Sequence, residues 1–218
     1  MVTRTARTRV KRKPLSRRRI LNAALRYIDE HGVEKLSMHK LGAALDVEAM
    51  SLYNHVANKS DVLDGVVGAI WEEIETAAAP GEDWRENYRD FARAIRDVLG
   101  RHPRAVPLIP SRPVMTDASL RAVKTQVTVA VESGVDTEEA YALLRTVTSY
   151  ALGHAAIYTN WELACASCAP SVADLLHPDT PAELAEVADV FCGRSDPDAE
   201  FELGLGLMLR RVAPFQAR

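Results

Sequence analysis

Apolar residues recur at helical spacing along most of the chain, and the first such segment shows the pattern clearly. Its apolar positions lie three or four residues apart and are Ile20, Ala23, Ala24, Tyr27 and Ile28. This spacing places them on one face of a helix. Ser16 can cap that helix, and Gly32 can end it in the left-handed conformation that glycine adopts at little cost. We therefore predict a helix from Ser16 to about His31.

Three shorter helical segments follow closely. Ser37 can cap a helix over about 38–45, and the pattern predicts another over 48–56. Asp46 falls in the turn between them, where the backbone needs an unusual angle that Asp tolerates better than a branched residue does. Asn58 can cap a further helix to about residue 76, with Asp61 in its first turn. Short helix, tight turn and short helix is the arrangement that places a helix in the DNA major groove.

Longer helices occupy the rest of the chain after a small-residue linker at 79–83. The expected helices cover residues 84–99, 117–133, 137–161, 181–191 and 198–212, with Thr137 capping the longest. Three prolines (Pro107, Pro110 and Pro113) predict irregular backbone between the first two. No segment reads as a strand. The expected fold class is all-α, with a three-helix head and a larger helical bundle.

One face of the helix over 137–161 carries mainly small side chains. They are Ala142, Thr146, Ser149, Gly153, Ala156 and Asn160. Small residues allow another helix to approach closely, either inside the subunit or across a dimer interface. The last helix offers a second candidate dimer element, an apolar stripe made of Phe201, Leu205, Met208 and Val212.

Charge is distributed unevenly along the 218 residues. The chain has 27 Lys and Arg against 30 Asp and Glu, and ten of the basic residues lie within residues 1–26, which contain no acid. The remaining residues therefore hold 17 basic against 30 acidic side chains. A basic head on an acidic body indicates that only the head meets a polyanion. We expect residues 1–14 to be a disordered basic arm that solubilises the chain or reaches DNA.

The head also offers polar side chains for DNA recognition. Val47, Leu52 and Val56 are expected to face inward, which leaves Ser51 and Asn54 able to reach base edges or phosphates. Tyr53 and His55 could contact phosphates, although Tyr53 could instead be a core residue and His55 a surface residue without a role. Lys59 and the start of its helix form an expected anion site.

The segment VEAMSLYNHVANKSDVLD (47–64) resembles the tetracycline-repressor (TetR) family, and the pairs Leu52-Tyr53, His55-Val56 and Asn58-Lys59 carry the resemblance. Weaker similarity to the regulatory part of the tetracycline repressor extends through the SRP step at 111–113 and the ESG step at 132–134. The family usually has Gly where this chain has Asp46. The expected DNA contacts, from the residues and from this resemblance, are Ser37, Met38, His39, Ala49, Met50, Ser51, Tyr53, Asn54, His55 and Lys59.

The resemblance implies a second half that binds a small molecule between helices and thereby releases DNA. The expected pocket residues are Phe91, Ile95, Leu108, Ser111, Gln126, Tyr150, His154 and Tyr158. Leu108 stands where the tetracycline-binding family member has a metal-binding His. Phe91 and Ile95 replace an Asn and an aromatic residue there, while Gln126 matches a ligand-contacting Gln. We therefore predict a partly apolar effector and no metal or cofactor, although Phe91, Ile95 and His154 could be ordinary core groups.

These expectations together describe a ligand-responsive repressor that binds a palindromic operator as a homodimer. Its parts are the arm at 1–14, the DNA-binding domain at 15–62 and the ligand-binding and dimerisation domain at 63–218. No apolar run is long enough for a membrane span, so we expect a soluble, cytoplasmic protein. Cys165 and Cys168 form a C-x-x-C motif. Redox motifs of this kind normally open a helix beside a strand, and the sequence predicts no strand here, so catalysis is not expected. Redox sensing through these cysteines, or an architectural DNA-binding role without an effector, are the alternatives.

Overall fold

The computed structural model describes residues 14–112, 114–164, 176–193 and 196–210, and every regular element in these ranges is helical. The predicted all-α class is therefore confirmed. Three helices form one end of the molecule: α1 (Arg17–His31), α2 (Met38–Ala44) and α3 (Ala49–Leu52). We call these three helices the head. The 3-10 turn η1 (Val33–Lys35) connects α1 to α2.

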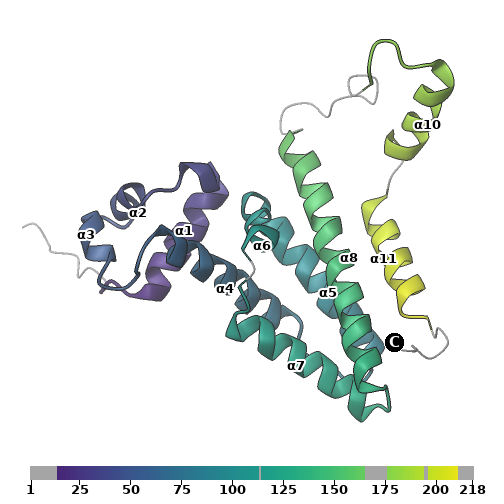
Figure 1. Ribbon diagram of the computed structural model, residues 1–218, viewed down its shortest axis with the longest axis horizontal. Coiled ribbons are helices and arrows are strands. Elements are labelled where there is room, and N and C mark those ends of the chain that lie inside the picture. The colour runs from purple at the N-terminus through teal and green to yellow at the C-terminus, as the bar shows by residue number, and fades with distance from the viewer. Residues whose placement is uncertain (1–13, 113, 165–175, 194–195, 211–218) are drawn as a thin grey trace, which may run out of the picture.

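Helix α4 (Lys59–Ala77) leads from the head into the larger part of the molecule, which we call the core (Figure 1). The core contains α5 (Trp84–Arg101), α7 (Asp117–Glu132) and α8 (Thr137–Ala164). Its shorter and C-terminal elements are η2 (Pro103–Ala105), α6 (Leu108–Ser111), α10 (Ala182–Gly193) and α11 (Pro197–Met208). Helix α5 packs against α4, α7 and α8, and thus lies at the centre of the core.

Three of the four side-chain caps that the sequence predicts are present. Ser16, Ser37 and Asn58 each accept a hydrogen bond from a backbone N–H in the first turn of α1, α2 and α4. The cap of α8 differs from the prediction, because Asp136 rather than Thr137 accepts from the N–H groups of residues 138 and 139. Asp and Thr both favour this position, so the pattern alone could not separate two neighbouring caps.

Several predicted boundaries are wrong. The expected helix over 48–56 is helical only at Ala49–Leu52, because Glu48 caps it and residues 53–55 form a turn. The proline-rich segment after α5 is not wholly irregular, since it contains η2 and α6. Gly32 has the expected positive φ of 88°, but its ψ of 158° is extended rather than left-handed. Only glycine adopts that conformation readily.

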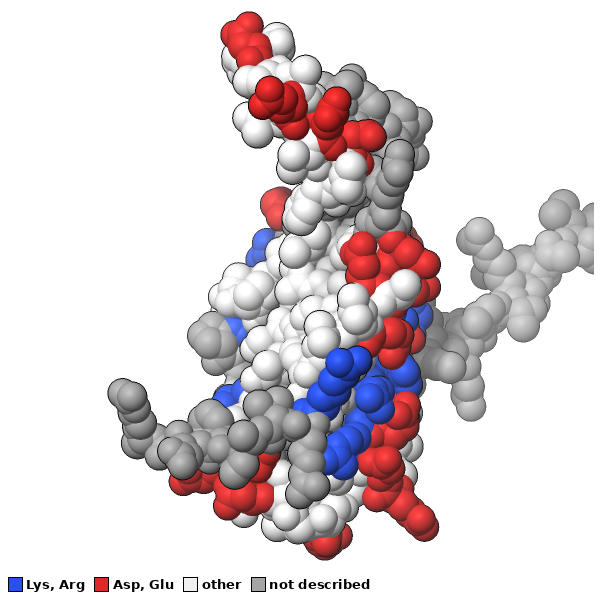
Figure 2. Space-filling view, turned by 90° about the vertical axis from the view of Figure 1, so that its right-hand side faces the viewer, with Lys and Arg blue, Asp and Glu red and all other residues white. Residues whose placement is uncertain are grey.

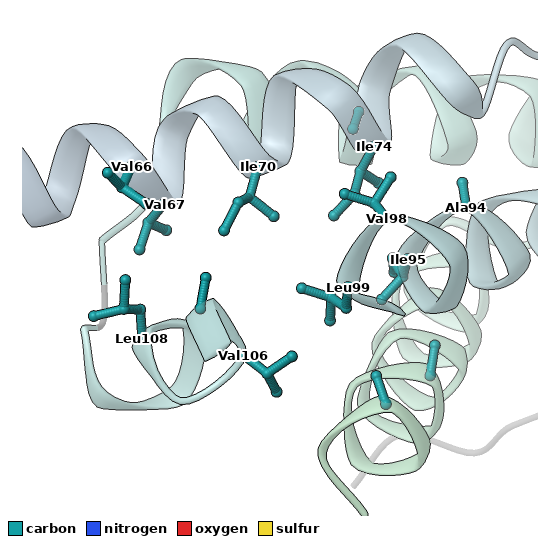
Figure 3. Close-up of a cluster of buried hydrophobic side chains, with 14 of the residues drawn as sticks. Val66, Val67, Ile70, Ile74, Ala94, Ile95, Val98, Leu99, Val106 and Leu108 are labelled. Atoms are coloured by element: carbon teal, nitrogen blue, oxygen red, sulfur yellow. The ribbon is translucent and has the colours of Figure 1, made fainter. Parts of the chain in front are cut away.

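Apolar side chains from α4, α5 and the segment that includes η2 and α6 meet in the core. Val66, Val67 and Ile70 of α4 face Leu99, Val106 and Leu108 (Figure 3), and all are buried. Ile74 packs at the other end of the cluster, near Val98. Burying side chains of this size stabilises a fold by about 1.5–3 kcal/mol each. In the described ranges, no helix is both long and apolar enough to cross a membrane.

Candidate nucleic-acid interface and effector site

The head has the geometry of a helix-turn-helix. Leu41, Leu45, Leu52 and Val56 are buried behind the turn, and Asp46 adopts a φ of 56° within it. Gly42 permits the tight packing, since a Cβ there would lie 2.9 Å from the carbonyl oxygen of Val47 and 3.1 Å from the backbone nitrogen of Ala49. The sequence analysis did not single out Gly42; a glycine inside a short helix was the available signal.

The ten residues predicted to contact DNA lie at the start of α2, on α3, in the turn after α3 and, for Lys59, at the first position of α4. Met50 and Tyr53 are strongly exposed, with 73% and 44% of their surfaces accessible. His39, Asn54 and His55 are also exposed, whereas the remaining five are partly buried: Ser37, Met38, Ala49, Ser51 and Lys59. The interpretation of Tyr53 as a core residue is therefore wrong. Tyr53, Asn54 and His55 lie on a turn rather than on a helix.

An ion pair fixes the loop between α3 and α4 against α1. Arg17 donates from both terminal nitrogens to Asp61, at 2.9 and 2.6 Å, and more weakly to the carbonyl oxygen of His55 at 3.4 Å. Asp61 also accepts from the backbone N–H of Ala57 at 2.8 Å. The hydrogen bond from Arg17, followed by that from Ala57, lowers the pKa of Asp61 to about 2. Arg17, counted within the basic N-terminal segment, thus positions the exposed loop.

Four of the predicted effector residues lie in or beside the apolar interior of the core. Phe91 and Ile95 are buried on α5, and Phe91 stacks on Trp71 of α4 with ring centroids 6.5 Å apart. Leu108 is buried in the cluster of Figure 3. Gln126 of α7 is 1% exposed and donates to the carbonyl oxygen of Ala78 at 3.3 Å, but its Oε1 atom is buried without a hydrogen-bond partner. Such an acceptor has lost its hydrogen bonds to water without gaining one in the protein, which lowers the stability of the fold.

The other four predicted effector residues have partners elsewhere. Ser111 is exposed and donates to the carbonyl oxygen of Pro107 at 2.7 Å. Tyr150, His154 and Tyr158 of α8 contact α11 instead: Tyr150 donates to the carbonyl oxygen of Glu200 at 3.1 Å, and Tyr158 to the carboxylate of Glu200 at 3.0 Å. The ring of Phe201 stacks on Tyr150 and meets His154 edge-on. The hydrogen bonds of Tyr150 and Tyr158 to Glu200 thus reach α11, whereas Gln126 bonds to the end of α4.

The apolar stripe predicted on the last helix has a different role from the expected one. Phe201 and Leu205 are buried inside the subunit, whereas Leu203 and Leu207 on the opposite side are exposed. Gly204 allows this packing, because a Cβ there would collide with the hydroxyl group of Tyr150. Val212 lies outside the described residues. The face of α8 with small residues is partly open: Thr146, Ser149 and Gly153 are exposed, whereas Ala142 and Ala156 are half-buried and Ala156 packs against the core.

Comparisons with known proteins agree with this architecture. Residues 20–66 match the model of bacterial regulatory proteins of the tetR family, and residues 77–213 match that of the tetracyclin repressor-like C-terminal domain. The chain belongs to the TetR family. This family consists of ligand-responsive transcriptional regulators rather than enzymes.

Individual relatives cover the TetR-family chain to different extents. An HTH-type transcriptional regulator of Saccharopolyspora erythraea is 32% identical over 151 residues, which are 69% of this chain but only 64% of that regulator. The tetracycline repressor protein class D of Escherichia coli is 26% identical over 199 residues, 90% of this chain and 88% of the repressor. A solved structure of a possible TetR-family regulator from Streptomyces coelicolor has a TM-score of 0.74 at 28% identity, covering 89% of this chain and 97% of that one.

The TetR-family core also contains a polar contact that sequence reasoning missed. Arg112, in the SRP step, places its Nε atom 2.6 Å from Asp64 of α4 and donates to the carbonyl oxygen of Ser60 at 3.2 Å. It contacts the Ser60 hydroxyl as well. The end of α6 is thereby tied to the first half of α4, near the head. Cys165 and Cys168, the predicted redox pair, lie outside the described residues.

Proposed function

We propose that this protein is a cytoplasmic transcriptional repressor that binds a palindromic operator as a homodimer and releases it on binding a small, partly apolar effector. The observation that carries the proposal is the exposed pair Met50 and Tyr53, held on a rigid helix-turn-helix at the end of α4. Two heads related by a twofold axis would read two half-sites. The arm at 1–14 would add phosphate contacts.

A surface suitable for the homodimer lies on α8 and α11. Ile157 of α8 and Leu203 and Leu207 of α11 are exposed apolar residues, and the neighbouring face of α8 has small side chains. Figure 2 views the molecule from the side of these helices and shows an uncharged surface bordered by acidic and basic groups. Apolar faces of paired helices with charged borders are suited to symmetric association.

The proposed effector site is the interior around Gln126, Phe91, Ile95 and Leu108. Apolar walls with a few polar anchors are the usual form of a small-molecule site. Gln126 offers the anchor, because its free Oε1 can accept a hydrogen bond from an effector hydroxyl or amide. Leu108 is apolar and cannot bind a metal ion. The relatives include tetracycline repressors, and we propose for this chain an effector that needs no bridging metal.

DNA binding can be tested by footprinting the full-length protein on sequences upstream of its own gene and the neighbouring genes. We expect one protected palindromic site. Tyr53→Ala should weaken binding to that site without lowering the melting temperature, while Tyr141→Ala, an exposed tyrosine of α8 with 40% accessibility, serves as the matched control. If no upstream site is protected, or if both variants bind like the wild type, the assigned reading surface is wrong.

Effector binding can be tested by thermal-shift screening against a panel of metabolites and antibiotics without added metal. A ligand at about 100 times its Kd should stabilise the protein by about 2.7 kcal/mol and should release the operator. Stabilisation without release would contradict the coupling of the two sites. The absence of any shift across a broad panel would favour an architectural role without an effector.

A further inference from the structure

His102 lies where the head meets the core. It ends α5, immediately before η2, and its ring touches carboxylates from two other helices. The Nδ1 atom is 2.9 Å from Oδ2 of Asp29 on α1, and the Nε2 atom is 3.3 Å from Oε2 of Glu73 on α4. One imidazole ring therefore connects the last turn of the first head helix with the core half of α4.

These two contacts require a particular protonation state. A neutral imidazole has one N–H donor and one acceptor nitrogen, whereas an ionised carboxylate only accepts. Both ring nitrogens of His102 face carboxylate oxygens, so both contacts are hydrogen bonds only when the ring carries two protons. Asp29 depends strongly on this arrangement, because its Oδ1 atom is buried without a hydrogen-bond partner.

The charged groups around the ring reinforce the junction. Arg101 of α5 lies 3.2 Å from the same oxygen of Glu73, and Arg104 of η2 donates to the carbonyl oxygen of Asp29 at 3.0 Å and to that of Glu30. Arg104 thus faces the C-terminal end of α1, where the helix dipole is negative. The hydrogen bond with Asp29 is the largest influence on the ring; burial opposes it and Glu73 adds to it, and the pKa of His102 is raised.

We propose that His102 is a positioning residue that fastens the head to the core when doubly protonated, so that the junction loosens as the ring loses a proton. A raised pKa means that the link is complete at low pH and is lost as the pH rises through the value in the folded protein. Neutral His102 keeps a proton for only one carboxylate and leaves the other facing a lone pair. The orientation of the head is thereby sensitive to pH.

The first test measures the ring itself in the full-length protein. Side-chain NMR of the histidines is recorded from pH 5.5 to 9.5, with His102 assigned by its absence in His102→Gln. We expect the ring of His102 to titrate above the ordinary histidine pKa of about 6.5, and Asp29→Asn to move the midpoint down. A wild-type midpoint at or below about 6.5 would overturn the proposal, whether or not the variants fold.

The second test measures the junction. Hydrogen exchange, corrected for its intrinsic pH dependence, is followed over the last turn of α1 and η1. In the wild type, raising the pH from 6 to 9 should speed exchange there by about tenfold, as expected for the loss of a charged hydrogen bond. His102→Gln should exchange fast at both pH values, and His177→Gln should behave like the wild type. Exchange that is equally slow at both pH values in all three proteins would overturn the proposed link.

The regulatory meaning of this junction rests on the proposed function, since the head is the part that would bind DNA. Neither experiment uses DNA or an effector. If the titration and exchange experiments contradict the role of His102, an observed operator footprint is unaffected. If footprinting finds no operator, the titration and exchange results still stand.

Discussion

Asp61 illustrates how one carboxylate organises the surface that we propose to face DNA. Its pKa of about 2 lies below the ordinary value of 3.8, so its contribution to stability is present at neutral pH and disappears as the pH falls towards 2. We expect Asp61→Asn to lower the melting temperature at pH 7, and the wild-type and variant curves to converge between pH 4 and pH 2. Calorimetry across this range measures the difference.

The control for this pair is Glu75→Gln, which breaks a similar ion pair with Arg121 far from the loop. It should leave operator binding unchanged, whereas Asp61→Asn should weaken operator binding because the loop loses its anchor. A constant difference in melting temperature from pH 7 to pH 2 would contradict the assigned titration.

Gln126 offers a sharper test of the effector site. Gln126→Met removes a buried acceptor without a partner and keeps a similar volume. Leaving such a group unpaired costs about 1–3 kcal/mol, while the single bond to Ala78 contributes about 1 kcal/mol. We therefore expect unchanged or slightly raised stability together with loss of the effector response. A response like that of the wild type, measured by operator release, would exclude Gln126 from the site.

Single residues also show what the sequence could reveal. Ser16, Ser37 and Asn58 could be recognised as caps because a cap acts on the backbone within three residues. The contact between Asp29 and His102 joins positions 73 residues apart, and no local pattern encodes such a distance. The free Oε1 of Gln126 was equally hidden, although the family resemblance pointed to the residue.

At the scale of the elements, α6 and α4 form the contact that can relay effector binding to the head. Arg112 joins them through Asp64 and Ser60. We expect Arg112→Gln to bind the effector with the thermal shift of the wild type but to release the operator far less, because coupling energies of about 1–3 kcal/mol can rest on few contacts. Operator affinity measured with and without effector gives the coupling directly.

Arg121→Gln is the matched control for Arg112→Gln, because Arg121 makes a two-pronged ion pair to Glu75 of the same α4 helix from α7. It should keep the coupling of the wild type. Equal loss of coupling in both variants would mean that any ion pair to α4 has this effect, which would contradict a specific role for Arg112.

The element α3 shows where helical periodicity reaches its limit. The apolar positions Leu52 and Val56 lie four residues apart and suggest a continuous helix, and both are indeed buried. In the turn at 53–55 the backbone N–H groups of Tyr53 and His55 bond three residues back, and only that of Val56 bonds four residues back, to Leu52. Burial alone therefore could not distinguish a helix from a turn. Short helices depend on tertiary packing more than on propensity, and their ends are accordingly hard to predict.

At the scale of the whole molecule, the open face of α8 predicts the assembly. A Cβ at Gly153 would meet no atom of its own subunit within 4 Å. Gly153→Leu should therefore fold normally as a subunit but should weaken the dimer, because the added side chain would push a closely packed partner helix away. Analytical ultracentrifugation over a concentration series measures the effect. Thr128→Leu, at an exposed site on α7, is the control and should not shift the dissociation constant.

The order of the helices could be predicted from the sequence, but which side of each helix packs against its neighbour could not. Phe201 and Leu205 were correctly placed on one stripe, yet the structure buries that stripe against its own subunit and exposes Leu203 and Leu207. Both sides of α11 are apolar, so the pattern did not indicate which side meets α8. The close approach of Gly204 to Tyr150 settles the rotation of the helix.

Helix α4 has 19 residues and runs without interruption from the exposed loop of the head into the core. At a rise of about 1.5 Å per residue it is a rod roughly 28 Å long. A tilt of only about 5° at the core end would swing the far end by about 2.5 Å, by the geometry of that length. In the proposed homodimer the two heads would have to match successive turns of the double helix, so a swing of this size would misalign the heads with DNA.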